Sequence, residues 1–156
     1  MIRDVLLHPH PLLTRRAEPA TDPERVVADL LDTMRSFGHC VGIAAPQIGE
    51  SVRIAVVDCT GHRKAPDAHG ELILVNPVIV AAEGSEVGRE GCLSIPELTA
   101  NVRRATAIAV EAEGVRVEAE GFEARVLQHE IDHLDGLLFL DRVESLEADV
   151  FRRMRR

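Results

Sequence analysis

At 156 residues, 46% of them hydrophobic and 28% charged, the chain has the size and composition of one globular domain with its own buried core. A formal net charge of −8 argues against a DNA-binding protein, since nucleic-acid binders are usually basic. Three cysteines are no basis for a disulfide framework, and we see no secretory signal and no long apolar stretch. The sequence therefore predicts a soluble cytoplasmic protein that makes no contact with a membrane.

The first regular element that the sequence predicts is a helix beginning near residue 23. Thr21 or Asp22 can cap this helix, Pro23 suits its first turn and Gly38 ends it. Apolar residues recur at helical spacing and predict one buried face, which consists of Val26, Val27, Leu30, Leu31, Met34 and Phe37.

Runs of aliphatic and β-branched residues then predict strands at 52–57 and 72–75. The segment 60–70 between these strands is polar and contains glycine and proline, so we expect an exposed loop. Two further runs, 106–111 and 115–119, flank a Glu-Gly pair that suits the turn of a β-hairpin.

The pattern becomes helical again at 122–134, and Gly136 would end this second helix. Ser145 can cap a C-terminal helix that continues to Met154. Because the order is helix, strands, helix, we expect an α+β fold rather than alternating β–α–β units.

The second predicted helix carries the most informative motif, His-Glu-Ile-Asp-His at residues 129–133. His129 and His133 are four residues apart, so on a helix they point the same way from neighbouring turns. Two imidazoles at this spacing can hold a metal ion, and Glu130 between them can reach a water molecule bound to it. The motif indicates a metal-dependent hydrolase whose class depends on the third ligand.

Three kinds of third ligand can be weighed. A downstream carboxylate could come from Glu144 or Glu147, close to the end of the chain. A third histidine is excluded, because Phe139 stands at the position that the extended protease motif requires. The remaining candidate is the thiolate of Cys92, within Glu-Gly-Cys-Leu-Ser at residues 90–94, although a single cysteine is more often a small buried hydrophobic residue.

A third segment, Val-Gly-Ile-Ala-Ala-Pro-Gln at residues 41–47, is rich in small residues that allow close approach of the backbone to a ligand. Gln47 ends this segment with an amide that could donate a hydrogen bond to a developing oxyanion. Taken alone, such a segment more often reflects tight packing.

Together, these three segments resemble the GxGxAAxQ, EGCLS and QHExDH motifs of peptide deformylases. The chain carries them in the same order at residues 40–47, 90–94 and 128–133, and the resemblance spans nearly all of its length. The resemblance implies a single deformylase-like catalytic domain over residues 1–156. It also implies an α+β fold in which mixed or antiparallel sheets pack around the helix with the HExxH motif.

The resemblance also implies a role for each matching residue. Cys92, His129 and His133 would bind one divalent metal ion, with Fe²⁺ expected as the native ion and Zn²⁺, Ni²⁺ or Co²⁺ able to replace it. Glu130 would act as general base towards the metal-bound water, and Gln47 and the backbone N–H of Leu93 would stabilise the oxyanion. Substrate contacts would come from Val41, Gly42, Gly91 and Val126.

The implied reaction removes the formyl group from the N-terminal formylmethionine of nascent polypeptides and releases formate. Such a substrate makes the ribosome a candidate partner. The basic cluster at residues 152–156 could contribute to that contact, although a solvated helix end is the simpler interpretation.

Three positions depart from the family pattern. Cys40 replaces the first glycine of GxGxAAxQ, Thr99 stands where many members carry an arginine that helps hold the peptide, and Gly88 stands where a bulkier residue often lies near the methionine pocket. None of them removes a ligand or the base, so the departures bear on substrate preference. They motivate a rival hypothesis, an amidase for another formylated or acylated amine. A metal-holding protein that binds formyl peptides without turnover is disfavoured by the intact Glu130 and Gln47.

Overall fold

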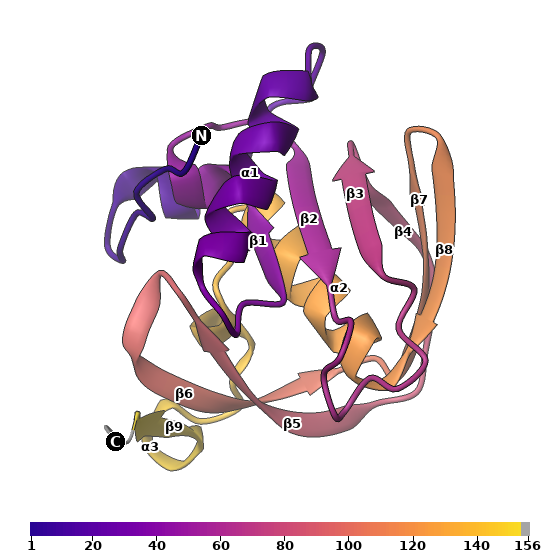
Figure 1. Cartoon of the computed structure of the whole chain (residues 1–156). Coiled ribbons are helices and arrows are strands. Elements are labelled where there is room, and N and C mark those ends of the chain that lie inside the picture. The colour runs from indigo at the N-terminus through magenta and orange to yellow at the C-terminus, as the bar shows by residue number, and fades with distance from the viewer. Residues whose placement is uncertain (154–156) are drawn as a thin grey trace.

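Three antiparallel sheets organise residues 1–153, the part of the chain that the computed structural model describes (Figure 1). The first has the order β1 (Gly42–Ala44), β2 (Ile54–Asp58), β3 (Glu71–Val75). The second has the order β4 (Val78–Glu83), β7 (Ala107–Ala112), β8 (Val115–Glu120). The third has the order β5 (Glu86–Cys92), β6 (Ile95–Arg104), β9 (Val150–Arg152). The expectation of antiparallel sheets in an α+β fold is confirmed.

Helix α1 (Glu24–Ser36) forms where the apolar periodicity predicts it. Neither Thr21 nor Asp22 caps it, because Pro23 takes the N-cap position and no side chain bonds the first turn. The apolar face packs against β1 and β2, and its fully buried apolar members are Val26, Leu30 and Met34.

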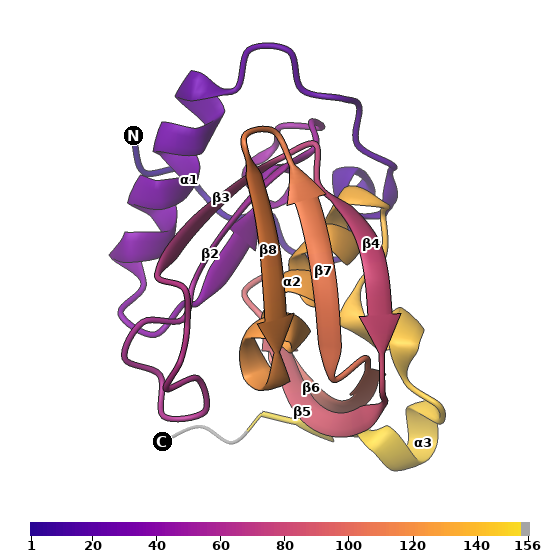
Figure 2. The ribbon, with the colours of Figure 1, turned by 90° about the vertical axis from the view of Figure 1, so that its right-hand side faces the viewer.

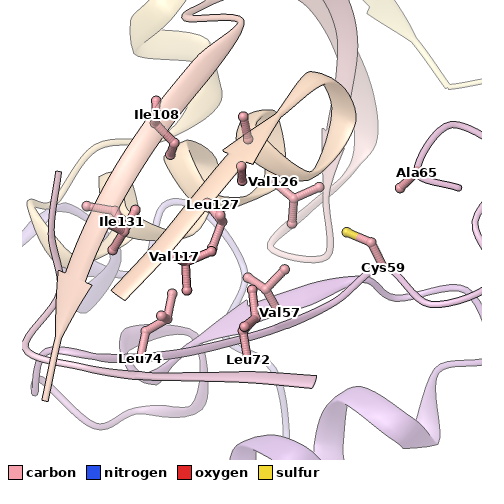
Figure 3. Packing of buried hydrophobic residues seen from close by; sticks show 13 residues of the cluster. Val57, Cys59, Ala65, Leu72, Leu74, Ile108, Val117, Val126, Leu127 and Ile131 are labelled. Atoms are coloured by element: carbon pink, nitrogen blue, oxygen red, sulfur yellow. The ribbon is translucent and has the colours of Figure 1, made fainter. Parts of the chain in front are cut away.

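Helix α2 (Gly121–Leu134), which carries both histidines, lies in the middle of the molecule. Figure 2 shows β4, β7 and β8 side by side in front of it, and Figure 3 shows the apolar cluster that fixes it between two sheets. The cluster joins side chains of β2 and β3 (Val57, Leu72, Leu74), of β7 and β8 (Ile108, Val117) and of α2 (Val126, Leu127, Ile131). Each such side chain, once buried, contributes roughly 1.5–3 kcal/mol, so α2 is held firmly on both sides.

The third sheet packs against a separate apolar cluster. Apolar residues of β5 and β6 pack against the segments before α1 and after α2, in a cluster of Leu13, Cys92, Ile95, Ala100, Val102, Leu138 and Phe139. The strand end that carries Cys92 is therefore part of a packed core rather than a free loop.

The sequence periodicity located some strands and missed others. The predicted strands at 52–57, 72–75, 106–111 and 115–119 are confirmed within two residues as β2, β3, β7 and β8. Strands β4, β5 and β6 were not predicted. Strand β4 is exposed along its whole length, and β5 contains two glycines, so neither shows the apolar alternation of a half-buried strand.

The prediction of a long C-terminal helix is wrong beyond its first turn. Ser145 does cap a helix, since its Oγ accepts a hydrogen bond from Ala148 N at 3.1 Å, but α3 (Leu146–Asp149) ends there. The chain continues as β9, which adds to the edge of β6 and satisfies backbone groups that would otherwise face water. Met154, where the predicted helix would have ended, lies outside the described residues. Among residues 1–153, no helix is both long and apolar enough to cross a bilayer.

The turn after α2 generates a stability prediction. Gly136 has φ +77°, and a Cβ there would lie 2.8 Å from the carbonyl oxygen of Thr14. Gly136→Ala should lower the free energy of unfolding by clearly more than the roughly 1–2 kcal/mol expected for a left-handed backbone alone, because the 10–17 segment must also move. Gly114, with φ +75° and nothing within 4 Å of its Cβ position, provides the matched control Gly114→Ala. Urea unfolding measures both variants, and equal losses would contradict the prediction.

Candidate metal centre and active site

Cys92, His129 and His133 come together in the core, as the sequence predicts. One ligand atom of each lies within 4.8 Å of the others, and all three side chains are buried. Cys92 Sγ lies 3.5 Å from His133 Nε2, close to the separation of about 3.5 Å expected for a sulfur and a nitrogen bound tetrahedrally to one ion. Burial alone would raise the pKa of the Cys92 thiol, but the neighbouring His133 and His129 lower it well below its ordinary value. The donor set is thus one thiolate and two imidazoles, which fits a first-row divalent metal ion.

The other residues weighed as a third ligand lie elsewhere. Glu144 is exposed and pairs with Arg103 at 2.8 Å, and Glu147 is exposed on α3. Phe139, where a protease of the metzincin type would carry histidine, stacks against the His129 ring with centroids 6.1 Å apart. Within residues 1–153, Cys92 is the candidate that meets the histidines.

A buried carboxylate orients His129. Glu90 Oε1 lies 2.8 Å from His129 Nδ1, while Arg104 binds both oxygens of the same carboxylate at 2.9 and 3.0 Å. Burial would raise the pKa of Glu90, but His129 and Arg104 hold it well below its usual range. A carboxylate can only accept hydrogen bonds, so Nδ1 of His129 carries the proton and its Nε2 lone pair is available as a ligand.

Further charged residues extend this network beyond what the sequence indicated. Arg125 donates to Glu90 Oε2 at 2.8 Å and to the Val102 carbonyl oxygen at 2.7 Å. Arg104 also reaches Asp132 at 2.6 Å, and Asp132 in turn binds Arg142. The sequence signal that could have revealed this network is that Arg125 and Asp132 fall on buried faces of α2, where a charged side chain needs a partner from another element.

Glu130 lies against strand β1 with little room to spare. Its side chain is buried, its Oε1 has no hydrogen-bond partner in the described part of the chain, and burial raises its pKa despite the nearby His129 and His133. A Cβ at Gly42 would come within 2.8 Å of Glu130 Oε2. Glycine at position 42 is therefore required for the close approach of strand and carboxylate.

The Gln47 amide is held in one orientation. Its Oε1 accepts a hydrogen bond from Ala44 N at 2.9 Å, so its Nε2 points to Ser94 Oγ at 3.1 Å and to Cys92 Sγ at 3.5 Å. Gln47 is almost fully buried. Two N–H bonds of a fixed amide are thus directed at the thiolate end of the cluster.

A cleft of about 740 Å³ opens onto this cluster. Its walls include the four residues predicted to contact substrate, Val41, Gly42, Gly91 and Val126, together with Leu93, Gln47, Cys92, His129 and Glu130. His133 is buried behind them and does not line the cleft. A larger hollow of about 950 Å³ lies over β7 and β8, but none of Cys92, His129 and His133 lines it. The smaller cleft is therefore the candidate active site.

Of the positions that depart from the family pattern, Cys40 lines the cleft, whereas Gly88 lies behind Arg125, a residue that does line it. Cys40 also packs against the apolar cluster around α1; its Sγ donates to the Gly42 carbonyl oxygen at 3.2 Å, and burial raises its pKa to about 12. A Cβ at Gly88 would lie 2.9 Å from the guanidinium carbon of Arg125. The space beside Gly88 is therefore occupied by a charged side chain from α2.

Comparison with known proteins agrees with this site. The sequence model of the polypeptide deformylase family matches residues 2–149. A peptide deformylase of Acidobacterium capsulatum is 38% identical over 100% of this chain and 95% of its own length. The chain belongs to the polypeptide deformylase family.

Solved deformylase structures share the fold. A peptide deformylase from Legionella pneumophila superimposes with a TM-score of 0.84 at 37% identity, covering 94% of this chain and 89% of that one. A peptide deformylase from Acinetobacter baumannii, solved with Met-Ala-Ser bound, gives a TM-score of 0.81 at 32% identity and covers 92% and 99%. As a deformylase family member the chain is a metal-dependent hydrolase of N-formylmethionyl polypeptides.

The network around Glu90 generates a prediction for metal binding. Glu90→Gln removes the carboxylate that the buried Arg104 and Arg125 share and weakens the acceptor for His129 Nδ1. We expect a loss of about 3 kcal/mol or more in unfolding free energy. We also expect metal affinity to fall about 10- to 100-fold. Competition with a chromophoric chelator measures the affinity.

The matched control is Glu111→Gln, which removes an exposed partner of Arg116. That variant should lose less than about 1 kcal/mol and keep its metal affinity. Wild-type metal affinity in Glu90→Gln would show that the orienting role is wrong.

Proposed function

We propose that this chain releases formate from N-formylmethionyl peptides at the cleft described above. The observation that carries the proposal is the Cys92, His129 and His133 cluster beside a buried Glu130, whose Oε1 has no hydrogen-bond partner among the described residues. In this proposal the cluster holds the metal ion, Glu130 is the general base, and Gln47 with the backbone N–H of Leu93 stabilises the oxyanion. Residues 1–156 would act as one catalytic domain.

The donor set supports a first-row divalent ion, and we propose Fe²⁺ as the native one with Zn²⁺, Ni²⁺ or Co²⁺ as replacements. When bound, such an ion lowers the pKa of water from about 15.7 towards 7 and polarises the formyl carbonyl. Glu90 keeps the His129 ring in the tautomer that binding requires.

Glu130 would take a proton from the attacking water and deliver it to the leaving amine. Its raised pKa and its buried position suit a group that must accept a proton and then give it up near neutral pH. The carbon–nitrogen bond breaks as the amine gains this proton, so the products are formate and a peptide with a free N-terminus.

Gln47 would donate to the oxygen that gains negative charge when water attacks the formyl carbon. Ala44 N holds the amide oxygen, so the amide nitrogen already points towards the cluster and exchanges one present acceptor, Ser94 Oγ or Cys92 Sγ, for the oxyanion. Leu93 follows Cys92 directly in the turn between β5 and β6 and lines the cleft, which is where a second donor is needed.

The Met-Ala-Ser peptide in the Acinetobacter baumannii structure supports a peptide substrate here, contacted by Val41, Gly42, Gly91 and Val126. On this proposal the substrate is a nascent chain, the protein works in the cytoplasm, and the ribosome is its partner. Co-sedimentation with ribosomes tests that partnership, and the basic residues at 152–156 are the first to remove. Arg155 and Arg156 of that cluster lie outside the described residues.

A second candidate is hydrolysis of another formylated amine. Arg125 favours it, because its guanidinium lies beside Gly88 in a wall that also contains Val126. The decisive experiment combines metal analysis of anaerobically purified protein with formate release from formyl-Met-Ala and from other formyl amines. Faster turnover of another amine would favour the second candidate, and release from none would reject both.

Removing the proposed base tests its role directly. Glu130→Gln should keep the metal content and lower formate release from formyl-Met-Ala at least about a hundredfold, since positioned acid–base groups contribute 10²–10⁴-fold. Glu123→Gln is the matched control: it changes another buried glutamate of α2, which binds His69 rather than facing the cleft. Turnover by metal-loaded Glu130→Gln close to that of wild type would contradict the assignment.

The oxyanion role of Gln47 has its own test. Gln47→Ala should cut turnover a hundredfold or more, equivalent to about 3 kcal/mol of barrier, with metal content unchanged. Gln128→Ala removes a different amide, one that bonds the backbone of Ala105 and Ala124, and should affect stability more than turnover. If metal-loaded Gln47→Ala retains wild-type turnover, the oxyanion role is wrong.

A further inference from the structure

One face of the third sheet carries a row of side chains that reaches the cleft. Because side chains alternate along a strand, Arg89 and Gly91 of β5 share a face. Their register partners on β6 are Asn101 and Thr99, and Thr99 is in turn paired with Phe151 of β9. Contacts confirm the shared face: Arg89 donates to Asn101 at 3.1 Å and to Thr99 at 3.3 Å, and its guanidinium lies 4.0 Å from the Phe151 ring centroid.

Arg153 completes this face from the C-terminal segment. A Cβ at Gly91 would overlap the Arg153 guanidinium and would lie 3.5 Å from Thr99 Cγ2. Glycine at 91 and a short side chain at 99 thus leave room for Arg153 beside the strand position that precedes Cys92. Arg89, Gly91 and Arg153 all line the cleft.

A second segment that lines the cleft is also cationic. Arg63 and Lys64 lie in the exposed loop after β2 and line the same cleft. The loop is held near α2 by His62, which stacks on Phe122 with centroids 4.2 Å apart, and Lys64 Nζ lies 5.9 Å from the same ring. Arg63, Lys64, Arg89 and Arg153 are called the basic rim from here on.

The basic rim is unusual because its charges are not neutralised. Most arginines in residues 1–153 pair with a carboxylate within 4.0 Å. The arginines that find no such partner among the described residues are Arg15, Arg63, Arg89, Arg152 and Arg153, and Lys64 likewise has none there. Three of these arginines and Lys64 form the basic rim. The cleft's own carboxylates do not compensate, since Glu90 is engaged by Arg104 and Arg125, and Glu130 is buried at the floor. A chain with net charge −8 therefore gathers free positive charge around its candidate active site.

We propose that the basic rim selects formylated peptides that carry a carboxylate shortly after the formylated residue. This inference rests on the proposed function. Gly91, which Arg153 overlies, precedes Cys92 by one position and Arg89 precedes it by three, so along an extended strand these positions lie roughly 3–10 Å from the ligand. That distance corresponds to the second and third residues of an extended substrate. The carboxylate can be an acidic side chain or the C-terminus of a short peptide.

The test compares isosteric peptides at low ionic strength. Formyl-Met-Ala-Glu-amide and formyl-Met-Ala-Gln-amide differ only in charge, and formyl-Met-Ala-Gln with a free C-terminus separates the two sources of carboxylate. We expect kcat/KM to be about tenfold higher for the Glu peptide than for the Gln amide, mainly through KM, because a cationic cleft raises the local concentration of anions. The preference should shrink towards unity in 0.5 M salt, where screening extends only a few ångströms.

Substitutions in the basic rim show which residues cause the preference for the Glu peptide. The double substitution Arg89→Gln with Arg153→Gln should bring the Glu-to-Gln ratio close to one, and Arg63→Gln with Lys64→Gln, on an exposed loop, should lower it as well. The latter pair keeps the test available if the sheet variant does not fold. The matched control is Arg152→Gln, which changes an exposed neighbour of Arg153 that does not line the cleft, and it should keep the wild-type ratio.

Three results of these assays would contradict the proposed role of the basic rim. Equal rates on the Glu and Gln amides would overturn the inference. So would a Glu-to-Gln ratio that survives both double substitutions, or one that Arg152→Gln abolishes to the same extent. Loss of ribosome co-sedimentation in the Arg89 and Arg153 double variant with an unchanged peptide ratio would assign the rim to RNA and also overturn it. No formate release from any peptide would reject the proposed function itself, a separate outcome.

Discussion

The carboxylate of Glu90 is the group on which the site depends. It lies in the protein interior, where an ionised group is tolerated only with full hydrogen bonding, and it has three cationic or N–H partners: Arg104, Arg125 and His129. Glu90 and Arg104 belong to the third sheet, and the other two belong to α2. The same ion network therefore joins the strand that ends in Cys92 to the helix that carries the histidines.

The rest of the geometry follows from that junction. Apolar packing places α2 between the first two sheets, but packing alone tolerates small shifts of a helix along its neighbours. Directional hydrogen bonds to Glu90, and the ion pair between Arg104 and Asp132, fix the position of α2 beside Cys92. Small residues then let β1 approach: Gly42 admits the Glu130 carboxylate, and Ala44 fixes the Gln47 amide. A centre of this kind is preorganised by its supporting residues as much as by its ligands.

The sequence predicted those features of the fold and the site whose signal lies within a few neighbouring residues. His129, Glu130, His133 and α2 itself were recognisable because a candidate metal-binding pair on a helix falls within five consecutive residues. Arg125 and Asp132 were missed as supporting residues because their partners are 35 and 28 positions away in the chain. The same limit applies to β9: its formation depends on the free edge of β6, some fifty residues earlier, and the local pattern of the last segment suited a helix. Exposed β4 and glycine-containing β5 likewise take their conformation from neighbours rather than from their own composition.

The departures from the family pattern acquire a physical meaning in this structure. At Gly88, the volume that a larger residue would fill is taken by Arg125, which also neutralises Glu90. At Thr99, where the resemblance leads one to expect an arginine, two guanidinium groups lie nearby. Arg89 of β5 donates a hydrogen bond to Thr99, and Arg153 of the C-terminal segment lies beside Gly91, the register partner of Thr99. Positive charge beside the cleft is thus redistributed rather than lost, and it now comes from β5 and the C-terminal segment. Since Cys92, His129, His133, Glu130 and Gln47 are unaffected by this exchange, the residues lining the cleft can differ in substrate preference while the candidate metal centre stays the same.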